Sequence, residues 1–308
     1  MTCPGYFKPA CRWSKRGGLR RARLLAALLT SISATAWSGS GSADPGFEPL
    51  PNVISLDTSR DASGGRDAYL DLDLRIHRGA RFMATLGSSR FDGQDREVVT
   101  RTRIVGVRSD PLHTVGAGVE FEDWGEEGSV IIRSWRATLD VNTEHWYAAF
   151  RPQRREYTLY TQARCLRCPA TATGRAGSVS LELGYYSDGP WGLSLGYTRH
   201  NYDFDVRRVV ALLQVERVFS SATRDLASSF EDSRSSFSVS YGGASYLWSL
   251  THIKSLSKVD GAETRFTTLR VSTDLNDHWR LNARLGRQRL SGTDQTAAFA
   301  GAGLAYSW

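Results

Sequence analysis

The segment LDLDLRIH, residues 70–77, decides how the chain folds, because apolar and polar residues alternate along it without a break. In an extended strand, successive side chains point to opposite faces, so every second residue lies on the same face. The segment therefore predicts a β-strand with one aliphatic face and one face that carries Asp71, Asp73 and Arg75.

The same alternation recurs along most of the chain. It is visible over residues 82–86, 115–121, 135–141, 179–185, 191–197, 237–241, 269–275 and 279–285. Short connections, such as 78–80 and 276–278, alternate with longer ones, such as 165–177 and 204–233. This layout is typical of a transmembrane barrel, with polar residues toward the lumen and apolar residues toward lipid. We predict an all-β fold, a single antiparallel up-and-down barrel of about 14 strands, with 12 as the alternative.

The first 43 residues have the order of a secretory signal peptide. Seven Lys and Arg residues precede the first acid, Asp44, and the apolar run 24–29 follows them. Small residues then allow cleavage after Ala36 or after Ala43. Removal of this segment lowers Lys+Arg from 39 to 39 − 7 = 32, which equals the 32 Asp+Glu. The mature chain, 44–308, is therefore near neutral, and its charge gives no reason to expect a nucleic-acid partner.

The last strand ends on an aromatic residue, with Leu304 and Tyr306 at alternate positions before Trp308. This ending resembles the assembly signal of Gram-negative outer-membrane β-barrels, the porin-like superfamily, and no narrower family is indicated. The resemblance covers the signal peptide, the last strand and the rhythm of hairpins between them. It implies insertion into the bacterial outer membrane by the barrel-assembly machinery, with lipid around the barrel. A soluble β-sandwich or lipocalin-like barrel, with its apolar faces inward, is the structural alternative.

Aromatic residues gather at one end of the predicted strands. Trp146, Trp191 and Trp279 each open a strand directly after a short connection, and Tyr306 and Trp308 close the last strand. Because amphipathic rings prefer the membrane–water interface, we predict that these residues form an aromatic girdle. The alternative is that aromatic residues simply favour strands.

The polar faces of the strands carry many ionisable residues. Such charges would cost up to about 2–4 kcal/mol each if they faced lipid at the bilayer midplane, so we predict that they face the lumen. They are Asp71, Asp73, Arg75, Glu120, Glu122, Arg136, Asp140, Glu182, Arg270, Asp274, Arg280 and Arg284. A barrel of this size predicts a narrow pore for small polar or charged solutes, since about 8 strands leave no channel and about 16 to 18 leave a wide one. A lumen plugged by Arg–carboxylate pairs and a loop is the alternative.

Two features lie in the longer connections. Cys165 and Cys168 form the only cysteine pair of the predicted mature chain. A second pair of zinc ligands and the setting of a redox fold are both missing, so we predict a disulfide in an outer loop and no metal or other cofactor. In the connection 204–233, the residues from Asp205 to Arg217 have helical spacing, which fits a helix in the barrel mouth or one in an exposed loop.

His200 supports an alternative function, because outer-membrane hydrolases carry Ser/His or Asp/His sets near the outer rim. We predict that His200 and His252 reach this rim, where Asp203 places a carboxylate near a general base. None of the local motifs of outer-membrane hydrolases surrounds His200. The pore is therefore preferred, an export or surface-assembly barrel remains open, and a monomer is expected.

Overall fold

The computed structural model describes the strands and most of their connections. The described residues are 51–62, 64–77, 79–92, 97–109, 114–126, 130–160, 171–207, 230–243, 246–259, 261–290 and 296–308. The predicted signal peptide, with cleavage after Ala36 or Ala43, and the predicted disulfide between Cys165 and Cys168 lie outside these residues and stay predictions.

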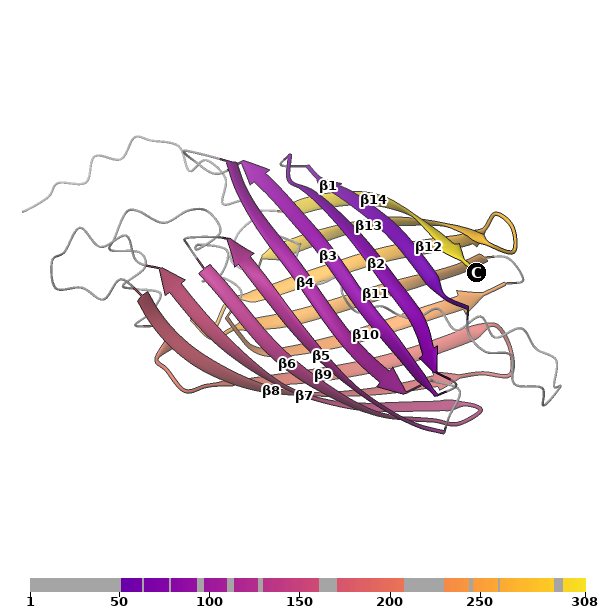
Figure 1. Cartoon of the computed structure of the whole chain (residues 1–308). Helices are drawn as coiled ribbons and strands as arrows, with labels where there is room; N and C mark the ends of the chain where they lie inside the picture. The colour runs from indigo at the N-terminus through magenta and orange to yellow at the C-terminus, as the bar shows by residue number, and fades with distance from the viewer. Residues whose placement is uncertain are drawn as a thin grey trace, which may run out of the picture.

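Fourteen strands form one closed antiparallel barrel (Figure 1). They are β1 (Val53–Asp61), β2 (Arg66–His77), β3 (Ala80–Asp92), β4 (Glu97–Ser109), β5 (Val115–Glu126), β6 (Val130–Asn142), β7 (Trp146–Tyr160), β8 (Thr171–Tyr186), β9 (Trp191–Tyr202), β10 (Glu231–Gly242), β11 (Tyr246–Ser257), β12 (Glu263–Asp274), β13 (Trp279–Leu290) and β14 (Thr296–Ser307). Each strand pairs with its neighbours in the chain, so the predicted up-and-down barrel of 14 strands is confirmed and the alternative of 12 is wrong.

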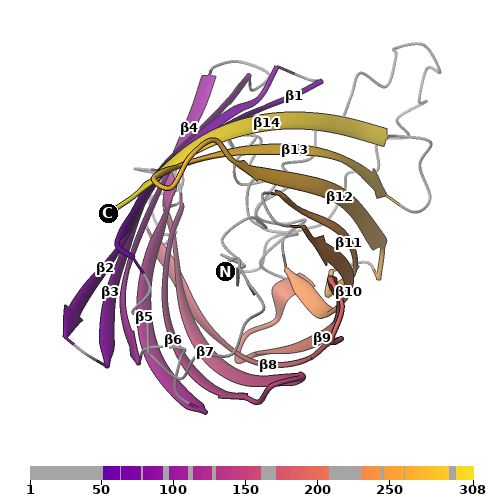
Figure 2. The same ribbon diagram turned by 90° about the vertical axis from the view of Figure 1, so that its right-hand side faces the viewer.

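The barrel closes where the first strand meets the last (Figure 2). The register pairs Val53 with Ser307 and Asp61 with Phe299. Just beyond these pairs, the backbone N–H groups of Asn52 and Trp308 donate to each other's carbonyl oxygens, at 3.1 and 3.2 Å. A closed sheet has no unpaired edge, which is what the interior of a bilayer requires.

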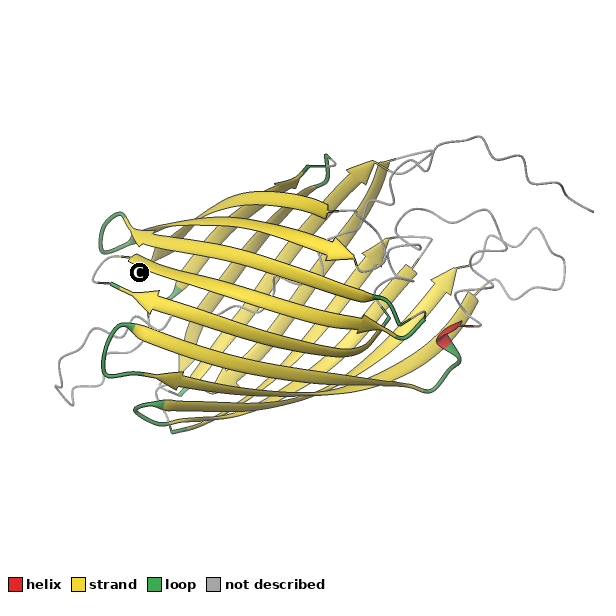
Figure 3. Cartoon of the chain, turned by 180° about the vertical axis from the view of Figure 1, so that it is seen from behind, coloured by secondary structure: helices red, strands yellow, loops and turns green. Residues whose placement is uncertain are grey.

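The two ends of the barrel differ in their connections. At one end, here called the turn end, short connections such as 143–145 and 275–278 join the strands, and β14 ends there (Figure 1). The opposite end, here called the loop end, carries the connections 161–170 and 203–230. Figure 3 shows in red the helical turn at Val206–Arg207, which lies at the loop end. Strand β8 begins at Thr171, so the connection before it is shorter than the 165–177 that the sequence predicts.

Large apolar side chains cover the outside of the barrel. Leu183 and Leu195, which are register partners on β8 and β9, are 58% and 59% exposed. Similar side chains on the other strands, among them Leu56, Val119, Leu139 and Leu285, form what we call the apolar belt. Exposed apolar surface of this extent needs lipid around it, so the alternative of a soluble barrel with inward apolar faces is wrong. No helix within the described residues is long and apolar enough to cross a bilayer.

Candidate functional site

The inward face of the barrel carries the ionisable side chains of the strands. Asp71 alternates with the belt residue Leu70, Arg136 with Trp135, and Arg284 with Leu285. The residues that the sequence assigns to the lumen all lie at such inward positions: Asp71, Asp73, Arg75, Glu120, Glu122, Arg136, Asp140, Glu182, Arg270, Asp274, Arg280 and Arg284. Inward and outward faces are thus chemically distinct along nearly every strand.

Many inward charges are paired across neighbouring strands. The ion pairs are Arg81–Asp73 (2.7 Å), Arg136–Glu120 (3.0 Å), Arg151–Glu182 (2.5 Å) and Arg280–Asp274 (2.6 Å). Hydroxyl groups satisfy other acids, since Thr85 donates to Asp71 at 2.6 Å and Ser134 to Glu122 at 2.9 Å. Sequence reasoning missed Arg81 and Arg151, although Arg151 follows the apolar Phe150 and Arg81 precedes Phe82 in the same alternation.

Two inward arginines that lie directly opposite each other form no ion pair with an acidic side chain of the described residues. Arg270 on β12 and Arg284 on β13 are register partners, so two like charges lie directly opposite each other. Arg284 is only 9% exposed, and its Nε makes no hydrogen bond in the part of the chain that the structure describes. Since like charges in this arrangement repel, the pair favours an anion or water between them.

Strand β14 separates these arginines from the acids of β1 and β2. A Cβ on Gly301 would lie 2.7 Å from Nε of Arg284 and 2.6 Å from a backbone oxygen of β1. A Cβ on Gly303 would fall on the carboxylate of Asp57. The two glycines therefore let Arg284 and Asp57 lie flat against the wall of the lumen from opposite sides. Arg284 on β13 and Asp57 on β1 thus lie on either side of a strip of small residues on β14.

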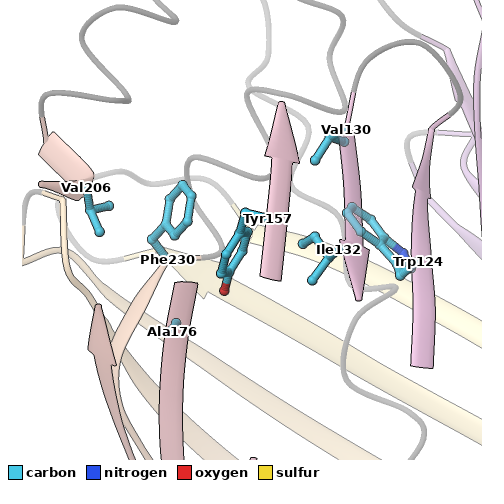
Figure 4. Close-up of a cluster of buried hydrophobic side chains, with 7 residues drawn as sticks. All are labelled: Trp124, Val130, Ile132, Tyr157, Ala176, Val206 and Phe230. Atoms are coloured by element: carbon cyan, nitrogen blue, oxygen red, sulfur yellow. The ribbon is translucent and has the colours of Figure 1, made fainter. Parts of the chain in front are cut away.

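An apolar cluster occupies the inward side of the strands at the loop end. We call it the mouth cluster; its residues are Trp124, Val130, Ile132, Tyr157, Ala176, Val206 and Phe230 (Figure 4). Phe230 is completely buried, with its ring centroid 5.4 Å from that of Tyr157. Val206, at the other end of the connection 203–230, is 3% exposed. Both ends of this connection therefore turn into the barrel, and the rest of the predicted helical stretch, from 208 on, lies outside the described residues.

Aromatic residues lie at the turn end of the apolar belt. Trp146, Trp191, Trp279 and Trp308 are 59%, 48%, 39% and 49% exposed. The rings of the first three pack on aromatic rings of neighbouring strands, with centroid distances of 4.9 Å for Trp146–Tyr185, 4.9 Å for Trp191–Tyr241 and 4.8 Å for Trp279–Tyr306. Sequence reasoning missed Tyr185 and Tyr241, which end strands just before short turns instead of opening them.

Comparison with known proteins gives a match in structure and none in sequence. No family model and no curated protein matches the chain. The CymD monoaromatic hydrocarbon channel aligns over 85% of this chain and 89% of its own, with a TM-score of 0.54 and 9% identity. The chain has the fold of an outer-membrane β-barrel. Two further barrels match with lower scores. A FadL homologue from Pseudomonas aeruginosa aligns over 84% of this chain and 90% of its own, with a TM-score of 0.48 and 10% identity. The KdgM porin aligns over 83% of this chain and 99% of its own, with a TM-score of 0.41 and 8% identity.

His200 is buried on the inward face of the barrel near the loop end. It is 6% exposed, and its Nε2 lies 3.6 Å from a carboxylate oxygen of Glu231. A β-bulge between Glu231 and Ser233 turns Glu231 inward, where Arg234 also binds it at 2.7 Å. Bulges redirect side chains in this way. The alternation in the sequence did not predict this bulge or the inward position of Glu231.

Within the described residues, no serine hydroxyl forms a hydrogen bond with His200. Ser178 is its register partner on β8, but the Ser178 hydroxyl donates to Oε1 of Gln153 at 3.3 Å. A serine nucleophile needs a hydrogen bond to its base. His252 lies on the outward face half-way along β11, with Nδ1 3.0 Å from Thr267 Oγ1, so the prediction that it reaches the rim is wrong. Within the described residues, no group of three or more His, Cys, Asp or Glu side chains could hold a metal ion.

Proposed function

We propose that this outer-membrane barrel is a narrow pore for small polar or charged solutes. One observation carries the proposal: the closed barrel of 14 strands presents apolar side chains outward and ionisable side chains inward. Barrels of about 8 strands are filled by their own side chains, whereas those of about 16 to 18 hold a water channel. A barrel between these sizes has room for a restricted aqueous path along its charged wall.

The likeness to the CymD channel supports a transport role through the shared fold alone. Its hydrocarbon cargo does not suit this chain, because the inward face here carries ion pairs and hydroxyl groups at most levels. Polar solutes can exchange hydrogen bonds with such groups, whereas an apolar solute would leave them unpaired. The wall of β12 and β13 attracts anions, and the wall of β1 and β2 attracts cations.

Conductance in a planar bilayer tests both the pore and its lining. The double variant Arg270→Gln/Arg284→Gln is expected to shift selectivity toward cations, with the anion-to-cation permeability ratio falling about threefold or more. The reason is the loss of two lumen charges, whose screened interaction with a passing ion amounts to about 1 kcal/mol. Reversal potentials of the refolded protein in a salt gradient provide the measurement.

A variant with the same change of charge provides the control for this experiment. Arg287 and Arg289 lie on the same strand, β13, and face outward. Arg287→Gln/Arg289→Gln is therefore expected to leave the selectivity near that of the wild type. Equal shifts in the two double variants would refute the assignment of Arg270 and Arg284 to the pore wall, and a folded wild type that conducts no ions would refute the pore itself.

We also propose that the last strand directs assembly and that the barrel acts as a monomer. Tyr306 and Trp308 stack at a centroid distance of 5.9 Å at the turn end, and Trp308 is 49% exposed. An aromatic residue left accessible at the end of β14 is available for the barrel-assembly machinery. Every strand contributes at least one exposed apolar side chain to the apolar belt, which suits lipid on every side.

A further inference from the structure

Basic residues follow the apolar belt on the outside of the barrel at the loop end. They occupy exposed outward positions on β1 to β4, β6 to β9 and β11 to β13. At the turn end, the same outward face carries aromatic side chains instead. The two edges of the belt therefore differ in charge, and the positive edge is at the loop end.

The densest part of this edge is a row of three arginines. Arg60 on β1 is the register partner of Arg66 on β2, which in turn is the register partner of Arg90 on β3. All three are exposed, and none forms an ion pair with a described side chain. Directly opposite side chains have Cβ atoms about 4.5–5.5 Å apart, and like charges there are destabilising. We call Arg60, Arg66 and Arg90 the arginine row.

Other basic residues of the edge have acids beside them. Arg133 lies 3.4 Å from Asp123, Arg175 lies 3.3 Å from Glu156, and Lys254 lies 2.5 Å from Glu263. These acids of the same protein neutralise part of the positive charge of the edge. The arginine row lacks such a counter-charge among the described side chains, so its repulsion is relieved best by an anion from outside.

The height of the row on the barrel indicates where that anion lies. Four residues nearer the bilayer centre on each strand, Leu56, Leu70 and Leu86 form a matching row of register partners, 53%, 41% and 57% exposed. Four residues of a strand span about 13 Å, or about 10 Å along the membrane normal at the usual tilt of a barrel strand. Since half of the hydrocarbon core measures about 15 Å, we expect a row that lies about 10 Å beyond exposed leucines of the belt to be close to the headgroup layer.

We propose that the arginine row binds the phosphate groups of an anionic lipid in the leaflet at the loop end. Guanidinium groups bind phosphate oxygens in a bidentate manner. Three guanidinium groups over a span of about 10 Å suit a lipid with more than one phosphate group. The inference depends on the membrane-spanning fold and is independent of whether the lumen conducts ions.

Lipid binding to the purified barrel tests this site. The wild type in neutral detergent is titrated with lipid A, which carries two phosphates, and with phosphatidylcholine, and binding is followed by native mass spectrometry. The triple variant Arg60→Gln/Arg66→Gln/Arg90→Gln is expected to bind lipid A at least tenfold more weakly. The matched control, Arg133→Gln/Arg154→Gln/Arg175→Gln, removes the same charge from the edge where acids are present and is expected to lose less than threefold.

Several results would overturn the proposal. These are an unchanged affinity of the row variant, an equal loss in the control, or equal binding of phosphatidylcholine. Inorganic phosphate that displaces lipid A at similar concentration would also overturn it, since the ligand would then be a soluble anion. Folding of each variant is checked by heat-modifiable migration, and if the triple variant does not fold, Arg66→Gln is compared with Arg175→Gln. These outcomes are separate from those of the conductance experiment.

Discussion

Replacing Leu183 and Leu195 together by arginine is expected to prevent stable insertion of the barrel into a bilayer. The two side chains are register partners on β8 and β9, and more than half of each is exposed in the apolar belt. An arginine that faces lipid near the midplane costs about 2–4 kcal/mol, so the pair costs about 4–8 kcal/mol, a large share of the stability of a typical domain. The folded fraction in lipid vesicles, measured by heat-modifiable electrophoresis, gives the result.

The control places the same charges on the other face of the same strands. Ser180 on β8 and Ser194 on β9 point inward, toward a wall that already carries Glu182 and Arg151. Ser180→Arg/Ser194→Arg is expected to fold in vesicles, because water and acids are available to an inward charge. A folded Leu183→Arg/Leu195→Arg barrel, or one that is soluble without detergent, would show that the belt does not face lipid.

Replacing Phe230 by alanine is expected to destabilise the barrel by about 3–5 kcal/mol, the usual loss for a buried aromatic side chain. The Phe230 ring is completely buried between the rings of Tyr157, Tyr202 and Phe204, with centroid distances of 5.4, 5.7 and 5.9 Å. Its removal leaves a cavity in the mouth cluster that rigid strands on either side cannot close. Urea unfolding of the barrel in vesicles, followed by tryptophan fluorescence, measures the change.

Phe237 on β10, seven residues further along the chain, provides the control for Phe230. It faces outward and is 45% exposed. Lipid chains fill the space that an outward ring leaves, so Phe237→Ala is expected to lower the free energy of unfolding by less than half as much. Equal losses at the two positions would mean that the mouth cluster contributes no packing of its own to the stability of the barrel.

The sequence predicted the fold well where the strands cross the belt. Between Leu70 and Ile76, one face must meet hydrocarbon and the other must not, so alternation is enforced at every residue. The up-and-down order of the strands and the side of each strand that carries charges follow from this constraint, whereas the choice between 12 and 14 strands needed the structure. Trp146, Trp191 and Trp279 open β7, β9 and β13, as their place directly after short turns indicates, and the girdle that they are expected to form stays a prediction.

The sequence was less informative at the loop end, where the strands rise above the belt. In β6, Val130 and Ile132 are buried on the inward side while Arg133 is exposed outward, which inverts the pattern of the belt. At the loop end the outward face no longer has to be apolar, so the alternation of residues does not show which side chains point inward. For the same reason, the inward turn of Glu231 at its bulge and the burial of Phe230 required the three-dimensional structure.

The seam between β1 and β14 has a consequence for biogenesis. Its nine residue pairs join Val53–Asp61 to Phe299–Ser307, at opposite ends of the described chain. All other strand pairs join neighbours in the chain and can form as local hairpins, but this ladder requires the first strand and the last strand together. Until then, the growing sheet keeps two open edges that invite aggregation. We therefore expect the closure of this seam to be the last step in the formation of the barrel.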